Sequence, residues 1–283
     1  MTNSQKGAVM MLLSAFFMAG MQVSVNFTSS AISFMDQVFA RHLIGFAASA
    51  VLCRELKLSL KSAKPYARPL LVNSLFGWLS MYTLFYASRY AQQGDVAILS
   101  KLSPFLVIIL SAIFLKEKLT RIQIPALILS LIGGYIAADP AFTSDKLPLL
   151  AAFISCLFGG VTSICLRSFG GKVHPLLVAL CFSGFSVLAS APFVLVDFSF
   201  PSTSDLAVLA LLGTLGYLGQ IFITYGFAKV SATTGSIYSQ SGILFSILFG
   251  FLFLDQIPQQ NTLVGAFLVF AATFLLYQYG EIL

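Results

Sequence analysis

Long apolar stretches separated by short polar breaks dominate the pattern of this sequence. Each stretch reaches the length of about 20 residues that a helix needs to cross the hydrocarbon layer of a bilayer. Their apolar positions run on without the alternation that a membrane β-barrel requires, as at 105–115 and 244–254. The pattern therefore predicts an all-α integral membrane protein with ten transmembrane helices. The predicted spans are 7–27, 33–53, 69–90, 95–115, 120–139, 147–167, 173–196, 205–228, 233–254 and 260–281.

The segment 75–137 has a second copy 139 residues later, and no gap is needed to align the two. Apolar matches alone would carry little weight in so hydrophobic a chain, but glycine and tyrosine matches at one fixed offset indicate a duplication. The matched pairs include Gly77 and Gly216, Trp78 and Tyr217, Tyr86 and Tyr225, and Ser100 and Ser239. We therefore expect two repeats of five helices each, 1–139 and 146–283, within one membrane body.

Five spans per repeat have a consequence for topology. Because five is odd, the second repeat must enter the membrane from the opposite face, which makes the two halves inverted copies. Inverted repeats are a recurring architecture of transporters, since exchanging the conformations of the two halves opens a central site alternately to either side.

Composition fits this picture, because 58% of the residues are hydrophobic and only 9% are charged. A soluble domain carries about 25% charged residues. The net charge of +6 follows the predicted topology: most Lys and Arg residues fall on the side that bears the N-terminus, and two fall in loops on the other side. By the positive-inside rule both termini are predicted to be cytoplasmic, and no nucleic-acid partner is implied. The apolar run after Lys6 is kept as a first span, since removing it as a signal peptide would break the repeat.

Two segments carry a family resemblance: Phe114-Leu115-Lys116-Glu117-Lys118-Leu119 at the end of the fourth span, and Ser103-Pro104-Phe105 within it. With the ten-span duplicated plan, the chain resembles the EamA-type branch of the drug/metabolite transporter superfamily. The matching segment of the second half, around Asp255-Gln256, has its acidic residue shifted by one position. The resemblance implies a secondary carrier in a bacterial inner membrane or a related organelle membrane. It also implies a central cavity among spans one to four and six to nine, with the fifth and tenth at the periphery, where they could support a homodimer.

Two charged residues fall within predicted spans, Arg41 and Lys101. Each lies about 9–12 Å in from the outer end of its span at 1.5 Å per residue. A charge at that depth is unfavourable unless it has a function or a partner. Both side chains are candidates for binding a carboxylate or phosphate in the cavity. The alternatives are that they extend to the outer interface, or that Arg41 pairs with Asp36.

Pro104, three residues after Lys101, predicts a bend in the fourth span, because proline removes a backbone donor. At the repeat-related position of Lys101 stands Gln240, which keeps that position polar without charge. Gly216 belongs to a run of glycines that allows close helix approach. Pro104 and Gly216 are therefore candidate gating residues, with ordinary packing as the alternative for both.

The remaining substrate-binding candidates are aromatic or neutral polar. Trp78 and Tyr82 share one face of the third span and could stack on a planar solute, or could simply pack. Tyr217 is the repeat partner of Trp78, while Gln22 and Asn73 are amides within the first and third spans.

The sequence contains none of the motifs GxSxG, HExxH, paired carboxylates or a phosphate loop, and its four cysteines and two histidines show no metal-ligand spacing. No cofactor or metal is implied, and no enzyme class is favoured. We expect a secondary transporter of a small organic metabolite, with an amino acid or other carboxylate-bearing solute first. A phosphorylated or nucleotide-like solute is the alternative within transport, and a lipid flippase or intramembrane enzyme is the alternative outside it. The absence of a mid-bilayer acidic residue favours exchange or facilitated movement.

Overall fold

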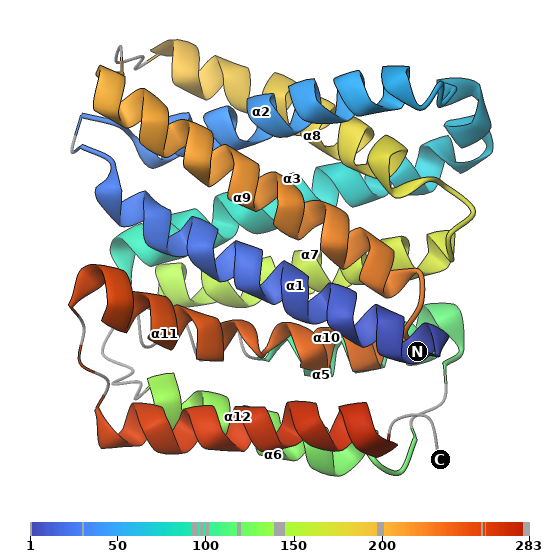
Figure 1. Cartoon of the computed structure of the whole chain (residues 1–283), viewed down its shortest axis with the longest axis vertical. Helices are drawn as coiled ribbons and strands as arrows, with labels where there is room; N and C mark the ends of the chain where they lie inside the picture. The colour runs from blue at the N-terminus through green and yellow to red at the C-terminus, as the bar shows by residue number, and fades with distance from the viewer. Residues whose placement is uncertain are drawn as a thin grey trace.

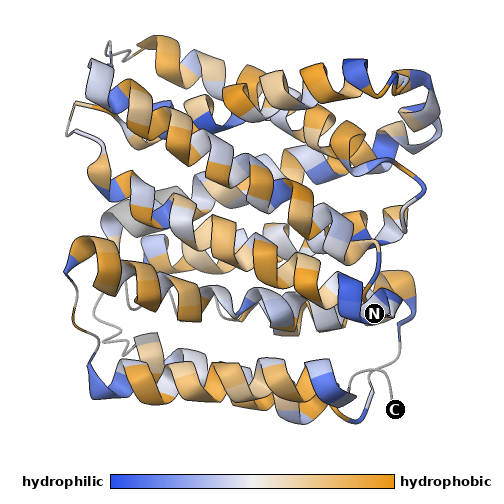
Figure 2. Cartoon of the chain, viewed as in Figure 1, coloured by the Kyte–Doolittle hydropathy of each residue, from blue (hydrophilic) through white to orange (hydrophobic). Residues whose placement is uncertain are grey.

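The computed structural model describes residues 2–29, 31–91, 96, 99, 102–117, 120–138, 145–196, 201–255, 257 and 259–279. These residues form helices joined by short connections, and none of them lies in a β-strand. The helices run side by side along one direction, with hydrophobic residues along their lengths and hydrophilic residues gathered toward the two ends of the bundle (Figures 1 and 2). The predicted all-helical membrane protein is thereby confirmed.

Where the structure describes them, the helices of the first half lie within a few residues of the predicted spans, except that α5 begins at Ser103, inside the predicted span 95–115. They are α1 (Asn3–Ser24), continued by η1 (Val25–Phe27); α2 (Phe34–Glu55); η2 (Leu60–Tyr66), which occupies the long connection; α3 (Ala67–Tyr90); α5 (Ser103–Leu110), continued by the π-helical turn η3 (Ser111–Leu115); and α6 (Gln123–Ala138).

The helices of the second half are α7 (Lys146–Phe169), α8 (Pro175–Val196), α9 (Thr203–Phe227), α10 (Ala232–Ser239), α11 (Gly242–Leu254) and α12 (Gln260–Tyr279). Within the described residues, six helices or helix pairs are long and apolar enough to cross a membrane: α1 with η1, α7, α8, α9, α10 with α11, and α12. The helices α2 and α3 have sufficient length, 22 and 24 residues, but carry more polar side chains. The stretches 103–115 and 123–137 are apolar but shorter.

Serine caps determine where several helices begin. Ser33 accepts a hydrogen bond from the backbone of Asp36 and Ser202 accepts one from that of Asp205, and both form complete capping boxes. The Asp205 carboxylate also accepts bonds from the backbone and side chain of Ser29, at 2.8 and 2.9 Å. This carboxylate therefore connects the end of α1 with the start of α9.

The main helix pairs join one helix of the first half with one of the second. The helix α1 packs against α9 and α3 against α7, α2 packs against α8, and α6 packs against α12. Two further contacts are also reciprocal, since α1 packs against α11 and α7 against α5. The two halves are therefore interleaved and share one interior.

The pair α6 and α12 lies at one side of the molecule (Figure 1). Its contacts with the rest of the bundle run through α10 and α11. The two helices meet at Gly133 and Gly265, where a Cβ added to Gly133 would lie 2.6 Å from the Gly265 carbonyl oxygen. Only glycine permits so close a backbone approach.

Both halves interrupt their fourth helix. The chain turns at Leu102 and α5 begins at Ser103, which places Pro104 in a first turn, where its missing amide breaks no helical bond. In the second half the interruption lies at Gln240 and Ser241, between α10 and α11, and no proline is present there. The sequence predicted the first interruption and missed the second.

Candidate functional site

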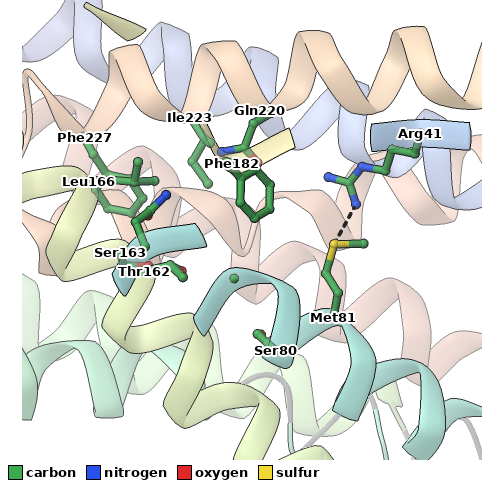
Figure 3. Close-up of a pocket in the computed structure, with 12 residues that line it drawn as sticks. Arg41, Ser80, Met81, Thr162, Ser163, Leu166, Phe182, Gln220, Ile223 and Phe227 are labelled. Atoms are coloured by element: carbon green, nitrogen blue, oxygen red, sulfur yellow. Dashed lines mark hydrogen bonds between the residues drawn. The ribbon is translucent and has the colours of Figure 1, made fainter. Parts of the chain in front are cut away.

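A cavity of about 170 Å³ lies between α2, α3, α7, α8 and α9 (Figure 3). It extends from Arg41, in the first half of α2, toward Leu166 and Phe227 in the last turns of α7 and α9. These last turns lie at the end of the bundle that carries the N-terminus, since Gly7 packs on Val230. The lining residues are Arg41, Asn73, Gly77, Ser80, Met81, Thr162, Ser163, Leu166, Phe182, Gln220, Ile223 and Phe227.

Arg41 is the one cation among the described residues of this lining. Its Nη1 donates to the thioether of Met81 at 3.4 Å and its Nη2 to that of Met18 at 3.8 Å. Within the described residues it has no carboxylate partner, and the only ion pair lies elsewhere, between Arg167 and Glu117. The alternative pairing with Asp36 is contradicted, because the Asp36 carboxylate accepts from Ser33 at the helix cap.

This environment leaves the guanidinium of Arg41 poorly satisfied. A thioether sulfur is a much weaker acceptor than a carboxylate oxygen. The close-up shows the guanidinium directed toward Met81 and the side of the cavity where Phe182 and Gln220 lie (Figure 3). An anion that enters the cavity would therefore meet the N–H groups of Arg41, which are bonded to weak thioether acceptors.

Gly216 of α9 makes the space that Arg41 occupies. A Cβ added at Gly216 would lie 2.7 Å from Nε of Arg41 and 2.9 Å from Sδ of Met21. The sequence suggested Gly216 as a point of close helix approach, and the structure places Arg41, a candidate binding residue, at that point.

Three hydroxyls line the cavity away from Arg41. Thr162 and Ser163 of α7 donate to the Gly159 carbonyl at 2.7 and 3.1 Å, and Ser80 of α3 donates to the Ser155 carbonyl at 2.8 Å. Ser80 lies beside the same turn of α7, because a Cβ at Gly159 would be 3.3 Å from its Oγ. Each of these hydroxyls already donates its proton to a backbone carbonyl, so toward a ligand its oxygen can only accept a hydrogen bond.

Asn73, a predicted binding residue, lines the same cavity and is only 2% exposed. Its Oδ1 is buried and has no hydrogen-bond partner. Tyr217, also predicted, borders a much smaller space of about 10 Å³ on the other side of Arg41, together with His42 and Ser183. The Tyr217 hydroxyl is likewise buried, and the hydroxyl of Ser49 is its polar neighbour.

The other predicted binding residues lie outside this lining. Trp78 and Tyr82 stack on each other with ring centroids 5.6 Å apart, and Trp78 Nε1 donates to Ser190 of α8 at 3.0 Å. Gln22 is exposed on α1, and Gln240 is buried at the break between α10 and α11. Lys101 lies outside the described residues. A role for these five side chains in binding stays a prediction.

Five lining residues were not predicted from the sequence as binding residues: Ser80, Thr162, Ser163, Phe182 and Gln220. The repeat offered a clue to one of them, because Gln220 stands 139 residues after Met81, which also lines the cavity. Serine and threonine are common in membrane helices, and without the helix rotations nothing in the sequence distinguishes those that face a cavity.

Comparison with known proteins identifies the family. The model of the EamA-like transporter family matches residues 5–138 and again residues 146–278. The chain belongs to this family. Its members and relatives are transporters, so this protein is a transporter of small metabolites and not an enzyme.

Several relatives of this EamA-like transporter are named. The pseudopaline exporter CntI of Pseudomonas aeruginosa is 27% identical over 270 residues, which cover 95% of this chain and 94% of that protein. An uncharacterized transporter of Helicobacter pylori is 25% identical over 279 residues, which cover 95% and 94%. The S-adenosylmethionine uptake transporter of Rickettsia conorii is 22% identical over 222 residues, which cover 78% and 75%.

A crystal structure has the same fold, with a TM-score of 0.79 over 97% of this chain and 98% of that one. The sequences are 16% identical, so this likeness concerns the fold alone.

The segment that carried the family resemblance forms a polar clamp in this EamA-like transporter. Glu117 accepts from Arg167 Nε at 2.8 Å with one carboxylate oxygen and from the backbone amide of Ala232 at 3.0 Å with the other. Arg167 also donates to the Phe227 carbonyl at 3.5 Å. The preceding residue, Lys116, has a left-handed backbone with φ of 54°, which turns the chain so that Glu117 can reach α10. The clamp holds the ends of α7, α9 and α10 together where the cavity approaches the bundle end.

Proposed function

We propose that this transporter carries a small carboxylate-bearing solute, an amino acid in the first instance, by alternating access. The observation that carries the proposal is Arg41, a cation in the wall of the cavity. Within the described part of the chain, the hydrogen-bond acceptors of its guanidinium are two thioethers. A guanidinium binds a carboxylate through two parallel hydrogen bonds, which thioethers cannot match. The cavity volume, about 170 Å³, lies below the ~300–1,000 Å³ of sites for drug-sized ligands, which favours a small solute.

Alternating access rests on the proposed inverted repeat of residues 1–139 and 146–283, with ten spans. The reciprocal packing of α1 on α9 and α7 on α3 supports it. So does the left-handed backbone at Lys116 and Asp255, φ 54° and 52°, because these residues end the fourth span of each half and stand at the repeat offset. The interruptions before α5 and α11 provide points at which each half can bend, and Pro104 and Gly216 are the proposed gating residues.

We place the protein in a bacterial inner membrane with both termini cytoplasmic. The distribution of Lys and Arg supports this orientation. In that orientation the cavity extends toward the cytoplasm, and the Glu117 clamp lies at the cytoplasmic end. The peripheral pair α6 and α12 presents apolar side chains such as Phe267 and Ile132 outward, which suits lipid or a second copy of the chain. Lys101 and Gln240 remain proposed as polar contributors from the fourth and ninth spans.

The direction of movement is left open by the relatives, one of which is named as an exporter and another as an uptake transporter. An exchanger would serve either direction.

The test is counterflow into proteoliposomes loaded with pooled amino acids, with labelled leucine and phenylalanine offered outside. We expect saturable uptake by the native protein, and a loss of uptake in Lys101→Ala if that residue contributes to the site. Absence of uptake of any carboxylate-bearing compound by correctly inserted native protein would refute the proposal. Uptake of labelled phosphorylated solutes in the same vesicles would then establish the alternative cargo.

A further inference from the structure

The two ends of the cavity differ in hydrogen-bonding chemistry. Arg41 can only donate, because a guanidinium has no acceptor. Figure 3 shows Arg41 on one side of the cavity and Thr162 and Ser163 on the other, with Gln220 and Phe182 between them. The cavity wall is therefore polarised along its length.

The side opposite Arg41 is an acceptor surface. Ser80, Thr162 and Ser163 each give their hydroxyl proton to a backbone carbonyl of α7, so donation to a ligand would require breaking a bond of 2.7–3.1 Å. Each oxygen keeps a lone pair for a ligand. Asn73 adds a side chain that is 2% exposed and whose buried Oδ1 has no partner. A half-turn of its amide would exchange Oδ1 and Nδ2 and present the oxygen to the cavity.

We propose that this acceptor surface is a subsite for an ammonium group, so that the substrate is a zwitterion with its carboxylate on Arg41 and its ammonium on Ser80, Thr162 and Ser163. The inference rests on the proposed function, since it assigns the second pole of the same substrate. An ammonium carries three N–H donors, and three hydroxyl oxygens from two helices offer three acceptors. A carboxylate or phosphate at this position would meet lone pairs and be repelled.

The subsite also predicts that the protein binds amino acids in preference to phosphorylated solutes. The phosphate of a phosphorylated solute would bind Arg41 but would offer no donor to the hydroxyl oxygens. An amino acid binds Arg41 with its carboxylate and the hydroxyl oxygens with its ammonium group. A zwitterion is neutral overall, so its entry leaves the net charge of the site unchanged, and hydroxyl oxygens alone bind the ammonium, since the described lining holds no acidic residue.

The experiment is competition for counterflow of labelled leucine and labelled phenylalanine by matched analogues. The N-acetyl derivatives keep the carboxylate and lose the ammonium, while the amides keep the ammonium and lose the carboxylate. For native protein we expect N-acetyl-leucine and N-acetyl-phenylalanine to compete at least about tenfold less well than the parent amino acids, as expected for loss of hydrogen bonds to a charged group.

The variant pair Thr162→Val and Ser163→Ala, made together, should reduce the preference for the parent over its N-acetyl derivative to about threefold or less. Ser168→Ala is the matched control, because Ser168 also lies on α7 and also donates to a backbone carbonyl, that of Cys165 at 2.7 Å, but is exposed outside the cavity. It should keep the native preference.

Equal competition by the N-acetyl and parent compounds in native protein would overturn the ammonium subsite and leave the carboxylate carrier standing. If neither the amino acids nor their N-acetyl derivatives were bound or moved, that result would instead refute the proposal that this transporter carries amino acids. Because parent and N-acetyl compounds are compared in native protein, this outcome does not depend on the folding of a variant.

Discussion

The ion pair between Glu117 and Arg167 is predicted to couple the two halves of the molecule energetically. Its side chains are 19% and 30% exposed, and the second carboxylate oxygen of Glu117 accepts from the first amide of α10. A hydrogen bond to a charged group contributes about 1.5–3 kcal/mol when its partners are partly withdrawn from water. An exposed pair contributes only about 0.2–1 kcal/mol. We therefore expect Glu117→Gln to lower the free energy of unfolding by about 1–2 kcal/mol, and Glu117→Ala by about 2–4 kcal/mol.

A double-mutant cycle of Glu117→Gln with Arg167→Gln isolates the pair. The assay is denaturant unfolding of the purified chain in detergent, followed by the fluorescence of Trp78, the single tryptophan. We predict a coupling free energy of about 1 kcal/mol or more. Arg121→Gln, at an exposed cation of the same bundle end, is the control and should change stability by less than about 0.5 kcal/mol. A coupling below about 0.3 kcal/mol would show that the clamp does not hold the halves together.

Three further predictions concern contacts between helices. Gly216→Ala should reduce the rate of counterflow several-fold with normal protein abundance, since its Cβ would lie 2.7 Å from Nε of Arg41 and displace the guanidinium. Gly133→Ala should lower the free energy of unfolding by about 1–3 kcal/mol, because its Cβ would meet the backbone of Gly265. Trp78→Phe should lower that free energy by about 1 kcal/mol through loss of the bond to Ser190 while leaving counterflow near native, since Trp78 lies outside the cavity lining; thermal unfolding and counterflow measured together check both parts.

Controls for the two glycine substitutions come from the same chain. A Cβ at Gly20 would lie 3.5 Å from its nearest neighbours, which is ordinary contact, so Gly20→Ala should preserve both transport and stability. Native counterflow in Gly216→Ala would show that Arg41 tolerates displacement. A large loss of counterflow in Trp78→Phe would instead support the predicted role of Trp78 in substrate binding.

The positions of the helices could be predicted from hydropathy because the bilayer length fixes how many apolar residues each requires. The predicted span 33–53 and the observed α2 (Phe34–Glu55) differ by one residue at the start, where Ser33 caps the helix, and by two at the end. The interruption between α10 and α11 was missed, because no proline or charge marks Gln240 and Ser241. Backbone breaks without proline depend on tertiary packing, which hydropathy does not report.

The sequence predicted residues of the candidate site only where a polar side chain lies in an otherwise apolar helix, a position at which burial is energetically unfavourable. Arg41 and Asn73 stand out as polar side chains in apolar helices, and both line the cavity. Trp78 and Tyr82 share one helix face, as their spacing predicted, but spacing alone does not say what that face contacts. Thr162 and Ser163 gave no indication, because a hydroxyl bonded to its own helix is acceptable on any face.

Counterflow by Arg41→Gln, measured against native protein and the Arg121→Gln control in vesicles of equal protein content, tests the central claim most directly. The account predicts that labelled leucine or phenylalanine uptake falls at least about tenfold in Arg41→Gln, as expected for loss of a charge-assisted pair. The control should match the native rate. Saturable uptake by Arg41→Gln at the native rate and affinity would contradict the account, because the carboxylate would then be recognised elsewhere.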